Sequence, residues 1–296
     1  MPGELQIPLW EWWIVLYFFA GGIAGGAYFT SAVVELVGRP EDRPIARMGY
    51  YIAFPLSLVC AVALIADLGR PERFWHMIVY SKTLLPWPKW DSPISVGAYA
   101  LLLFGAFSLL SFLDALVETG RLPWAPLREK YSGAPRMVYS ILGGLNGFFL
   151  ASYTGVLLAT THLPAWSSNP LLGALFLASG ASTGMAAIAL GLVLTKVDVG
   201  EAWAKLKQAD NVAMIVEIVL LVVFVALLFA SGSGLSGLNL VLLIGGVLVV
   251  GLILPLTMQW RKAKATANAT IGVSALVLLG GLVMRAVIVM GGQGLM

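Results

Sequence analysis

Five side chains able to hydrogen-bond or exchange protons stand within or at the edge of long apolar stretches, where ionisable groups are costly. At 1.5 Å per residue, their positions along the expected helices place all five within about 13 Å of one membrane boundary. Phenol, carboxylate and imidazole groups hydrogen-bond a ligand and transfer its protons, and arginine stabilises an anion. The sequence therefore predicts a polar, proton-exchanging site near one membrane face, formed by Tyr17, Asp67, Tyr153, His162 and Arg285.

Three acidic residues form a second layer toward the opposite face. Glu35 and Asp114 lie near helix ends, where their side chains can reach the interface. Glu217 lies deeper and is expected to face a bundle interior, where Lys196 or another basic residue could neutralise it. Two interpretations of this layer stay open: the acids carry protons from the cytoplasm, or they are structural.

A polar stripe follows one face of an expected helix, because its members recur every seven residues. One interpretation is a proton or water path that joins the two layers, and the other is interhelical hydrogen bonding, which is common in membrane bundles. The structural interpretation is favoured for Tyr139 and Asn146, and the functional one for Tyr153. The members of the stripe are Tyr139, Asn146, Tyr153 and Thr160.

Eight apolar blocks must position these residues, and each has about the 20 residues needed to cross some 30 Å of hydrocarbon. The chain is 59% hydrophobic and 11% charged, whereas a soluble domain has about 25% charged residues. We therefore predict an all-α membrane protein, a single integral domain over 1–296 with two four-helix bundles. The expected helices span 12–37, 48–67, 94–117, 136–161, 170–195, 211–231, 237–258 and 269–290.

The few metal-binding residues restrict the cofactors. One cysteine, Cys60, excludes an intrachain disulfide and a cysteine-ligated iron–sulfur cluster or zinc site within this chain. The two histidines, His76 and His162, both lie at the expected outer boundary, where they do not bracket a buried haem. We expect no bound metal, so any electrons must arrive from a partner.

Basic residues predict the orientation, because lysine and arginine concentrate in cytoplasmic loops. Most of the 18 such residues lie in the first, third, fifth and seventh connections. Both termini and the even connections are therefore placed outside the cytoplasm. The net charge of +3 does not indicate a nucleic-acid partner.

The longest outer connection, 68–93, is rich in aromatic and proline residues and is expected to be an ordered element on the membrane interface. It is either a docking surface or an aromatic belt, which is common at membrane interfaces. Its aromatic residues include Phe74, Trp75, Trp87 and Trp90.

Several strings occur together, in order, over most of the chain. This pattern resembles the NrfD or polysulfide-reductase-type membrane subunit, and the combination of DLGRPERF, SPxSxG and a late-helix arginine is specific. The strings are GGIAGGAYFTSA at 21–32, DLGRPERFWHM at 67–77, SPISVG at 92–97, SYTG at 152–155, LASGASTG at 177–184, and Arg285 followed by GGQG at 291–294.

The resemblance implies an eight-helix, quinone-reactive anchor of a respiratory complex in a bacterial or archaeal cytoplasmic membrane, surrounded by lipid. Such subunits bind no haem or iron–sulfur cluster and take menaquinone or ubiquinone as an exchangeable substrate. They dock a four-cluster [4Fe–4S] ferredoxin-like subunit, which leads to a molybdopterin subunit or a multihaem cytochrome. The isolated protein is expected to have no activity.

The resemblance also assigns residues. Tyr153 in SYTG matches the tyrosine that contacts the quinone. Family members can have Asn and His on the first helix, where this chain has Ile14 and Tyr17, and the Tyr17 hydroxyl could still donate a hydrogen bond. Asp67 and His162 could pass protons, although His162 could equally be a helix cap.

Residues of the outer loop are expected to dock the partner or to stabilise an anionic semiquinone, a role that Arg285 could share. For Arg70 and Arg73 a capping or salt-bridge role remains equally open. The outer-loop residues are Arg70, Arg73, Trp75 and His76.

Three further hypotheses stay open. The acids and the stripe could make the complex a proton pump. A secondary transporter could use the same intramembrane acids, although no internal repeat with paired broken helices is visible. A purely structural anchor is the third, and the outer tyrosine and arginine cluster argues against it.

Overall fold

The computed structural model of the protein describes residues 10–80, 85–86, 88–123, 133–161, 163–167, 169–232, 235–260 and 266–295. This part contains eight helical segments long and apolar enough to cross a membrane, which confirms the predicted number. Helices are favoured because hydrocarbon offers no hydrogen-bond partners to the backbone. The first six are α1 (Trp12–Val37), α2 (Arg43–Asp67), α3 (Pro93–Glu118), α5 (Ala134–Ala159), α7 (Leu172–Leu194) and α8 (Ala202–Ala230).

The last two spans contain π-helical turns, which hydropathy does not reveal. The seventh span joins α9 (Gly237–Val241), the π-helix η3 (Leu242–Ile253) and α10 (Leu254–Trp260). The eighth is α11 (Ala267–Ala286), continued by the π-helix η4 (Val287–Gly291). Pro55, inside α2, does not break the helix, as expected.

Two helices begin well before their predicted starts. α2 begins at Arg43 rather than at 48, after the 3-10 turn η1 (Pro40–Asp42), and α8 begins at Ala202 rather than at 211. In the added part of α8, Ala202 and Leu206 are buried while Lys205 is exposed. Such an amphipathic extension stabilises a helix beyond the hydrocarbon, so the apolar run alone underestimates its length.

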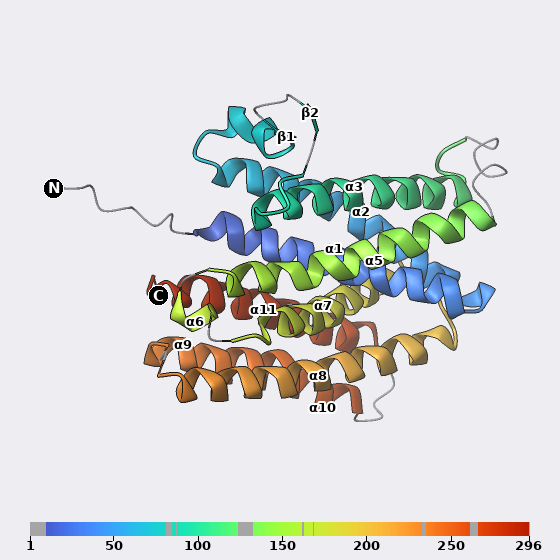
Figure 1. Ribbon diagram of the computed structural model, residues 1–296. Helices are drawn as coiled ribbons and strands as arrows, with labels where there is room; N and C mark the ends of the chain where they lie inside the picture. Colours follow the sequence, from blue (N-terminus) through green and yellow to red (C-terminus); the bar gives the residue numbers. More distant parts are fainter. Residues whose placement is uncertain are drawn as a thin grey trace.

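The packing of the helices groups them into two bundles of four, as predicted. In Figure 1, α2 and α3 lie on one side of the molecule and α8 and α10 on the other. In the first bundle α1 packs on α2, α2 on α3, α3 on α5, and α5 on α1. In the second, α7 packs on α8, α8 on η3 and α10, these on α11, and α11 on α7. The two bundles meet where α1 and α5 pack against α7.

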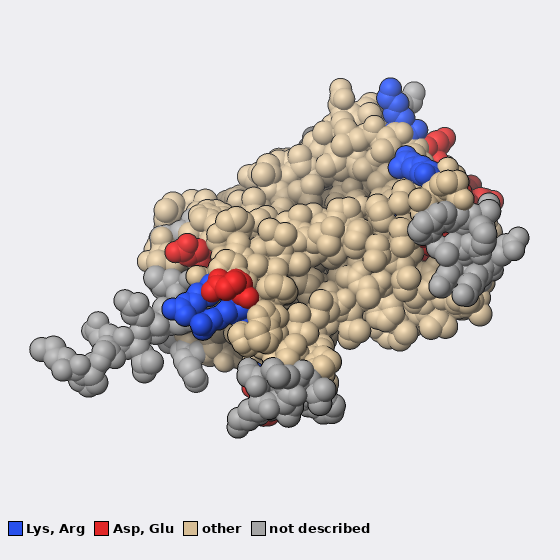
Figure 2. Space-filling model, turned by 90° about the horizontal axis from the view of Figure 1, so that it is seen from above, with Lys and Arg blue, Asp and Glu red and all other residues tan. Residues whose placement is uncertain are grey.

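Both termini lie at the same end of the molecule, as the even number of spans requires (Figure 1). We call this the outer end, following the predicted orientation, and the other the inner end. Lysine, arginine and acidic residues gather at the two ends in Figure 2, and the surface between them is uncharged in that view. This distribution is that of a multi-pass membrane protein with eight candidate spans.

The outer connection between α2 and α3 is ordered in its described residues, as predicted. It contains the 3-10 helix η2 (Pro71–Met77) and two short antiparallel strands, β1 (Val79–Tyr80) and β2 (Leu85–Pro86). Trp75 and His76 stack at a ring-centroid distance of 3.8 Å. A second short outer element, α6 (Pro164–Ser167), follows α5.

Replacement of a glycine by alanine at the interface between the bundles should weaken their packing. A Cβ added to Gly26 in α1 would overlap the backbone carbonyl of Gly180 in α7. We expect Gly26→Ala to lower the stability by about 1–3 kcal/mol, the usual cost of overpacking. Gly272→Ala is the matched control, because nothing lies within 4 Å of its added Cβ. Thermal unfolding in mild detergent measures both, and equal melting temperatures would contradict the expectation.

Candidate functional site

A cavity of about 120 Å³ lies at the outer end of the first bundle, between α1, α2, α3 and α5. It brings together three of the five residues predicted for the outer site, Tyr17, Asp67 and Tyr153. Its volume is comparable to that of a protein cavity of roughly 150 Å³ known to bind benzene, so one aromatic ring is a suitable occupant. The lining residues are Trp10, Ile14, Tyr17, Phe18, Leu64, Asp67, Leu68, Met77, Ile94, Gly97, Ala98, Tyr153 and Leu157.

Two polar groups in this cavity are available to a ligand. Tyr17 is buried, yet its hydroxyl makes no hydrogen bond to any residue in the described ranges. Asp67, the last residue of α2, likewise has no hydrogen bond or ion pair within the described chain. Arg70 and Arg73 therefore do not pair with it, and the salt-bridge hypothesis for these two arginines is not supported at Asp67.

The third polar group, Tyr153, is positioned by the first turns of α3. Its hydroxyl donates a hydrogen bond to the carbonyl of Pro93. A Cβ on Gly97 would lie 2.5–2.7 Å from the Cε1, Cζ and hydroxyl of Tyr153, so only glycine leaves room for the ring. The SPISVG and SYTG strings thus form one local structure in which α3 holds the tyrosine of α5.

The start of α3 also binds the outer connection between α2 and α3, which contains η2. Ser92 is the N-cap of α3 and accepts a hydrogen bond from the Ser95 amide at 3.4 Å. The Ser95 hydroxyl donates to the carbonyl of Met77 at 3.4 Å, and the Tyr99 hydroxyl donates to that of Ile78 at 2.5 Å. Because Met77 lines the cavity, these bonds connect the cavity wall to the same helix that positions Tyr153.

Arg285 does not line the cavity, although depth along the helix predicted it there. It is fully buried on the other side of α1, where its Nε donates to the carbonyl of Phe18 at 3.0 Å. Its Nη1 donates to Ser179 Oγ at 3.1 Å and to the carbonyl of Gly281 at 2.8 Å. Since Phe18 lines the cavity, Arg285 supports that wall from behind.

Glu217 is buried in the second bundle, as expected of an interior residue. Its Oε2 accepts a hydrogen bond from Ser182 Oγ at 2.6 Å. The Ser182 Oγ also lies 3.3 Å from the carbonyl oxygen of Ser179, and the hydroxyl of Ser179 accepts a hydrogen bond from Arg285. The polar series therefore runs from α8 through α7 to α11, and then to Phe18 in α1.

Asp210 is a functional candidate that the sequence analysis missed. It lies two turns before Glu217 on α8, is 6% exposed, and accepts a hydrogen bond from Gln259 Nε2 at 2.8 Å. Its Oδ1 and the Oε1 of Gln259 are buried without a hydrogen-bond partner in the described chain. The seven-residue spacing to Glu217 would have placed both acids on one helix face, had the helix not been predicted to begin at 211.

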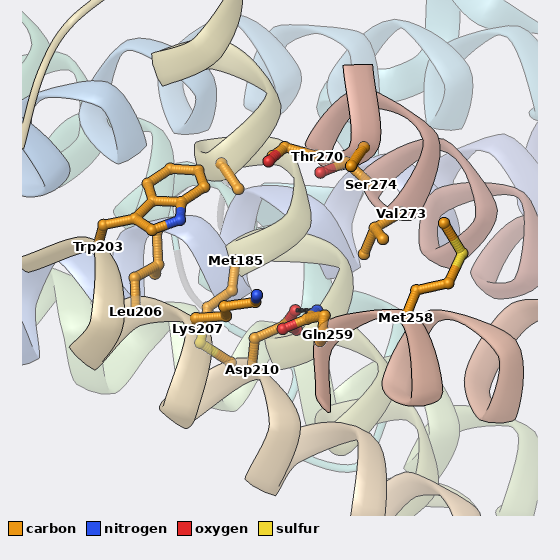
Figure 3. A pocket seen from close by; sticks show the side chains of 12 residues that line it. Met185, Trp203, Leu206, Lys207, Asp210, Met258, Gln259, Thr270, Val273 and Ser274 are labelled. Carbon is orange, nitrogen blue, oxygen red and sulfur yellow. Dashed lines mark hydrogen bonds between the residues drawn. The ribbon is translucent and has the colours of Figure 1, made fainter. Parts of the chain in front are cut away.

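Asp210 faces a second cavity, of about 200 Å³, at the inner end of the second bundle. In Figure 3 Asp210 and Gln259 point toward each other, with Thr270 and Ser274 on the opposite wall. Lys207 is among the lining residues but forms no ion pair with Asp210 within 4.0 Å. An acid next to a cavity at the inner end is well placed to exchange protons with water from that side.

The acids of the first bundle are neutralised instead. Glu35 pairs with Arg43 and accepts a hydrogen bond from the Tyr50 hydroxyl at 2.8 Å. Asp114 pairs with Arg43 at 3.4 Å, and its Oδ1 accepts from Arg136 Nη2 at 2.8 Å. These mostly buried side chains form an ionic cluster that closes the inner end of this bundle.

The polar stripe of α5 is not a continuous path. The Tyr139 hydroxyl and the Asn146 Oδ1 are buried without hydrogen-bond partners among the residues described. Thr160 donates to the carbonyl of Leu157 in its own helix at 2.8 Å. A proton path along this face would need molecules other than these side chains.

The remaining predicted residues lie at the outer surface or outside the described part. Arg70 immediately precedes η2, and Arg73, Trp75 and His76 lie within it, with Trp75 42% exposed. His162 is outside the described residues, so its predicted role stays a prediction.

Comparison with known families gives the same interpretation as the motif strings. The model of the family described as "Polysulphide reductase, NrfD" matches residues 2–296. The chain belongs to the NrfD family. NrfD-family relatives include a polysulfide reductase component of Wolinella succinogenes, 27% identical over 309 residues that cover 96% of this chain and 94% of the relative.

Two other relatives differ in coverage. The NrfD homolog of Haemophilus influenzae is 27% identical over 311 residues, which cover 96% of this chain and 94% of that protein. A selenate reductase subunit of Mesobacillus selenatarsenatis is 31% identical over 80 residues, 26% of this chain and 19% of the relative. The similarity to the Wolinella and Haemophilus proteins therefore extends over nearly the whole chain.

Gly97 provides a test of the cavity that leaves its polar groups in place. Gly97→Ala should push the Tyr153 ring out of position, and we expect binding of a naphthoquinone analogue to weaken at least tenfold. Gly105→Ala on the same helix is the control, because its added Cβ meets nothing within 4 Å. Titration calorimetry on the purified protein measures both affinities. Equal binding by the two variants would show that this cavity is not the binding site.

Proposed function

We propose that this protein is the quinone-reactive membrane subunit of a respiratory oxidoreductase complex. It would pass electrons between the membrane quinone pool, menaquinone or ubiquinone, and an extracytoplasmic [4Fe–4S] ferredoxin-like subunit. The observation that carries the proposal is the convergence of Tyr17, Asp67 and Tyr153, from three helices, on one cavity at the outer end. Membership of the NrfD family supports it, and favours it over a secondary transporter.

The hydrogen bonding of the cavity suits a quinol. Tyr153 already donates its proton to Pro93, so its oxygen is left to accept a hydrogen bond from a quinol hydroxyl. No described residue bonds the Tyr17 hydroxyl or the Asp67 carboxylate, so Tyr17 can bond the other end of the ring and Asp67 can accept a proton. Oxidation of the quinol to quinone then releases two electrons to the partner and two protons, the first by way of Asp67.

The partner is expected to dock on the outer segment that covers the cavity. Met77, at the end of η2, lines the cavity, while Trp75 in the same turn is exposed. A short path from quinol to cluster follows if the partner binds here, beside Arg70 and Arg73. Because this protein has one cysteine, the clusters would belong to that partner, which would lead to a molybdopterin subunit or a multihaem cytochrome. Without these partners we expect no turnover.

Substitution of the polar residues in the cavity tests the proposal. Tyr153→Phe removes a hydrogen-bonding hydroxyl and Asp67→Asn removes a proton acceptor, and each should reduce quinol turnover by the assembled complex at least tenfold. Tyr51→Phe is the control, because that hydroxyl bonds the carbonyl of Ala115 away from the cavity. Steady-state assays with a water-soluble quinol measure the effect. Undiminished turnover by both cavity variants would reject the quinone site.

A second candidate function, proton translocation, is favoured by the polar series in the second bundle. Asp210 adjoins a cavity at the inner end, and Glu217 and Ser182 follow it toward Arg285. Neither carboxylate forms an ion pair with the described residues, in contrast to Glu35 and Asp114 of the first bundle. A buried acid without an ion pair is costly to ionise, and such a residue inside a membrane protein therefore suggests a functional role. We infer that this protein moves protons between the inner face and the region behind the quinone cavity.

Glu217→Gln should separate proton movement from quinol binding. We expect the number of protons moved per electron to fall by at least half in proteoliposomes, while the affinity for quinol stays unchanged, because Glu217 does not line the outer cavity. Glu201→Gln, at an exposed position just before α8, is the control. A pH-sensitive dye records the protons. An unaltered proton-to-electron ratio in both variants would exclude this path.

A further inference from the structure

The closing GGQG string, residues 291–294, has no part in the chemistry described so far, although each of its first three residues makes a specific contact. A Cβ on Gly291 would overlap the side chain of Asn239, and one on Gly292 would overlap Trp166. Gln293 forms hydrogen bonds with the backbone of Trp10, two residues before α1. Its Oε1 accepts from the backbone amide of Trp10 at 2.8 Å, and its Nε2 donates to the carbonyl of Trp10 at 2.9 Å.

Trp10 is part of the wall of the outer cavity. Its ring stacks on Trp166 at a centroid distance of 5.5 Å and meets Phe18 edge-on at 6.2 Å. Trp166 is itself buried and donates from Nε1 to the carbonyl of Ile288 at 2.8 Å. The ring of Trp10 is therefore positioned by α6, and its backbone by Gln293.

The position of Trp10 depends on these contacts because it precedes α1. Helical hydrogen bonds begin with the carbonyl of Glu11, so the amide and carbonyl of Trp10 have Gln293 as their hydrogen-bond partner within the described chain. Gln293 is itself fixed, since its Nε2 also donates to the carbonyl of Val289 at 2.9 Å. A two-point bond of this kind gives orientation as well as attachment.

We infer that Gln293 is a positioning residue of the quinone cavity, which holds Trp10 as a fixed aromatic wall against the ring of the bound quinol. The inference rests on the proposed function. Aromatic rings pack favourably face to face with an offset or edge to face, so a fixed indole contributes binding without taking part in proton transfer. The same helical segment supports the α1 wall twice, because Arg285 binds the carbonyl of Phe18 and Gln293 binds Trp10.

This role predicts a defect in binding and not in chemistry. The hydrogen bonds of Gln293 go to Trp10 and Val289 and not to Tyr17, Asp67 or Tyr153, so a quinol that does bind should react at the normal rate. For Gln293→Ala in the assembled complex we expect the KM for a water-soluble quinol to rise at least fivefold, with kcat within twofold of the wild type. Trp10→Ala should have the same effect, and the double variant should be no worse than Trp10→Ala alone, because both remove one wall.

Two further variants make the test decisive. Gln293→Glu keeps the shape of the side chain but sets a carboxylate against the carbonyl of Trp10, so the KM should rise even if Gln293→Ala does not assemble. Asn268→Ala, which removes an exposed polar group near the inner end of α11, is the control and should leave KM unchanged. An unchanged KM in Gln293→Ala or Gln293→Glu, or additive effects in the double variant, would overturn the inference. If the wild-type complex itself showed no quinol turnover, the proposed function would be rejected instead.

Discussion

The close approach of α1 to its neighbours is the contact on which the rest of the structure depends. Gly25 meets the backbone of Gly147 in α5, and Gly26 meets that of Gly180 in α7. Small residues allow such backbone contact, which supplies the packing energy that the hydrophobic effect does not provide between helices in lipid. Because α1 belongs to the first bundle and packs against the second, one face of its outer half lines the cavity and the other receives Arg285. Phe18 connects the two faces, because this residue lines the cavity and its carbonyl accepts the hydrogen bond from Arg285.

The buried acidic residues have arginine partners in the first bundle but not in the second, among the residues described. Glu35 and Asp114 of the first bundle are enclosed by two arginines, which makes that inner end an ionic closure. Asp210 and Glu217 of the second bundle are buried among hydroxyl and amide groups, with no arginine or lysine in an ion pair to them in the described chain. Under the proposed function, quinol chemistry would belong to the first bundle and proton movement to the second, and α1 lies where the two bundles meet.

The sequence predicted which of the described residues lie toward the outer end of their helices better than it predicted the direction in which each side chain points. Long apolar runs determine the number and order of helices, and a rise of 1.5 Å per residue gives depth, so the meeting of Tyr17 with Tyr153 was predictable. Depth does not tell which side of a helix a residue faces, and Arg285 consequently lies behind the cavity wall instead of in the cavity. Hydropathy also reports hydrocarbon length and not helix length, which is why the start of α8, and Asp210 with it, was missed.

The most direct test of the central claim is to locate the quinone in the intact complex. A photoreactive quinone, activated in membranes and followed by mass spectrometry of the labelled peptides, identifies the residues nearest the ring. We expect labelling of residues 10–18, which include the start of α1, and of 153–157 in α5, suppressed by excess unmodified quinone. Labelling confined to the residues that line the inner cavity, such as 203–210 or 269–274, would contradict the central claim.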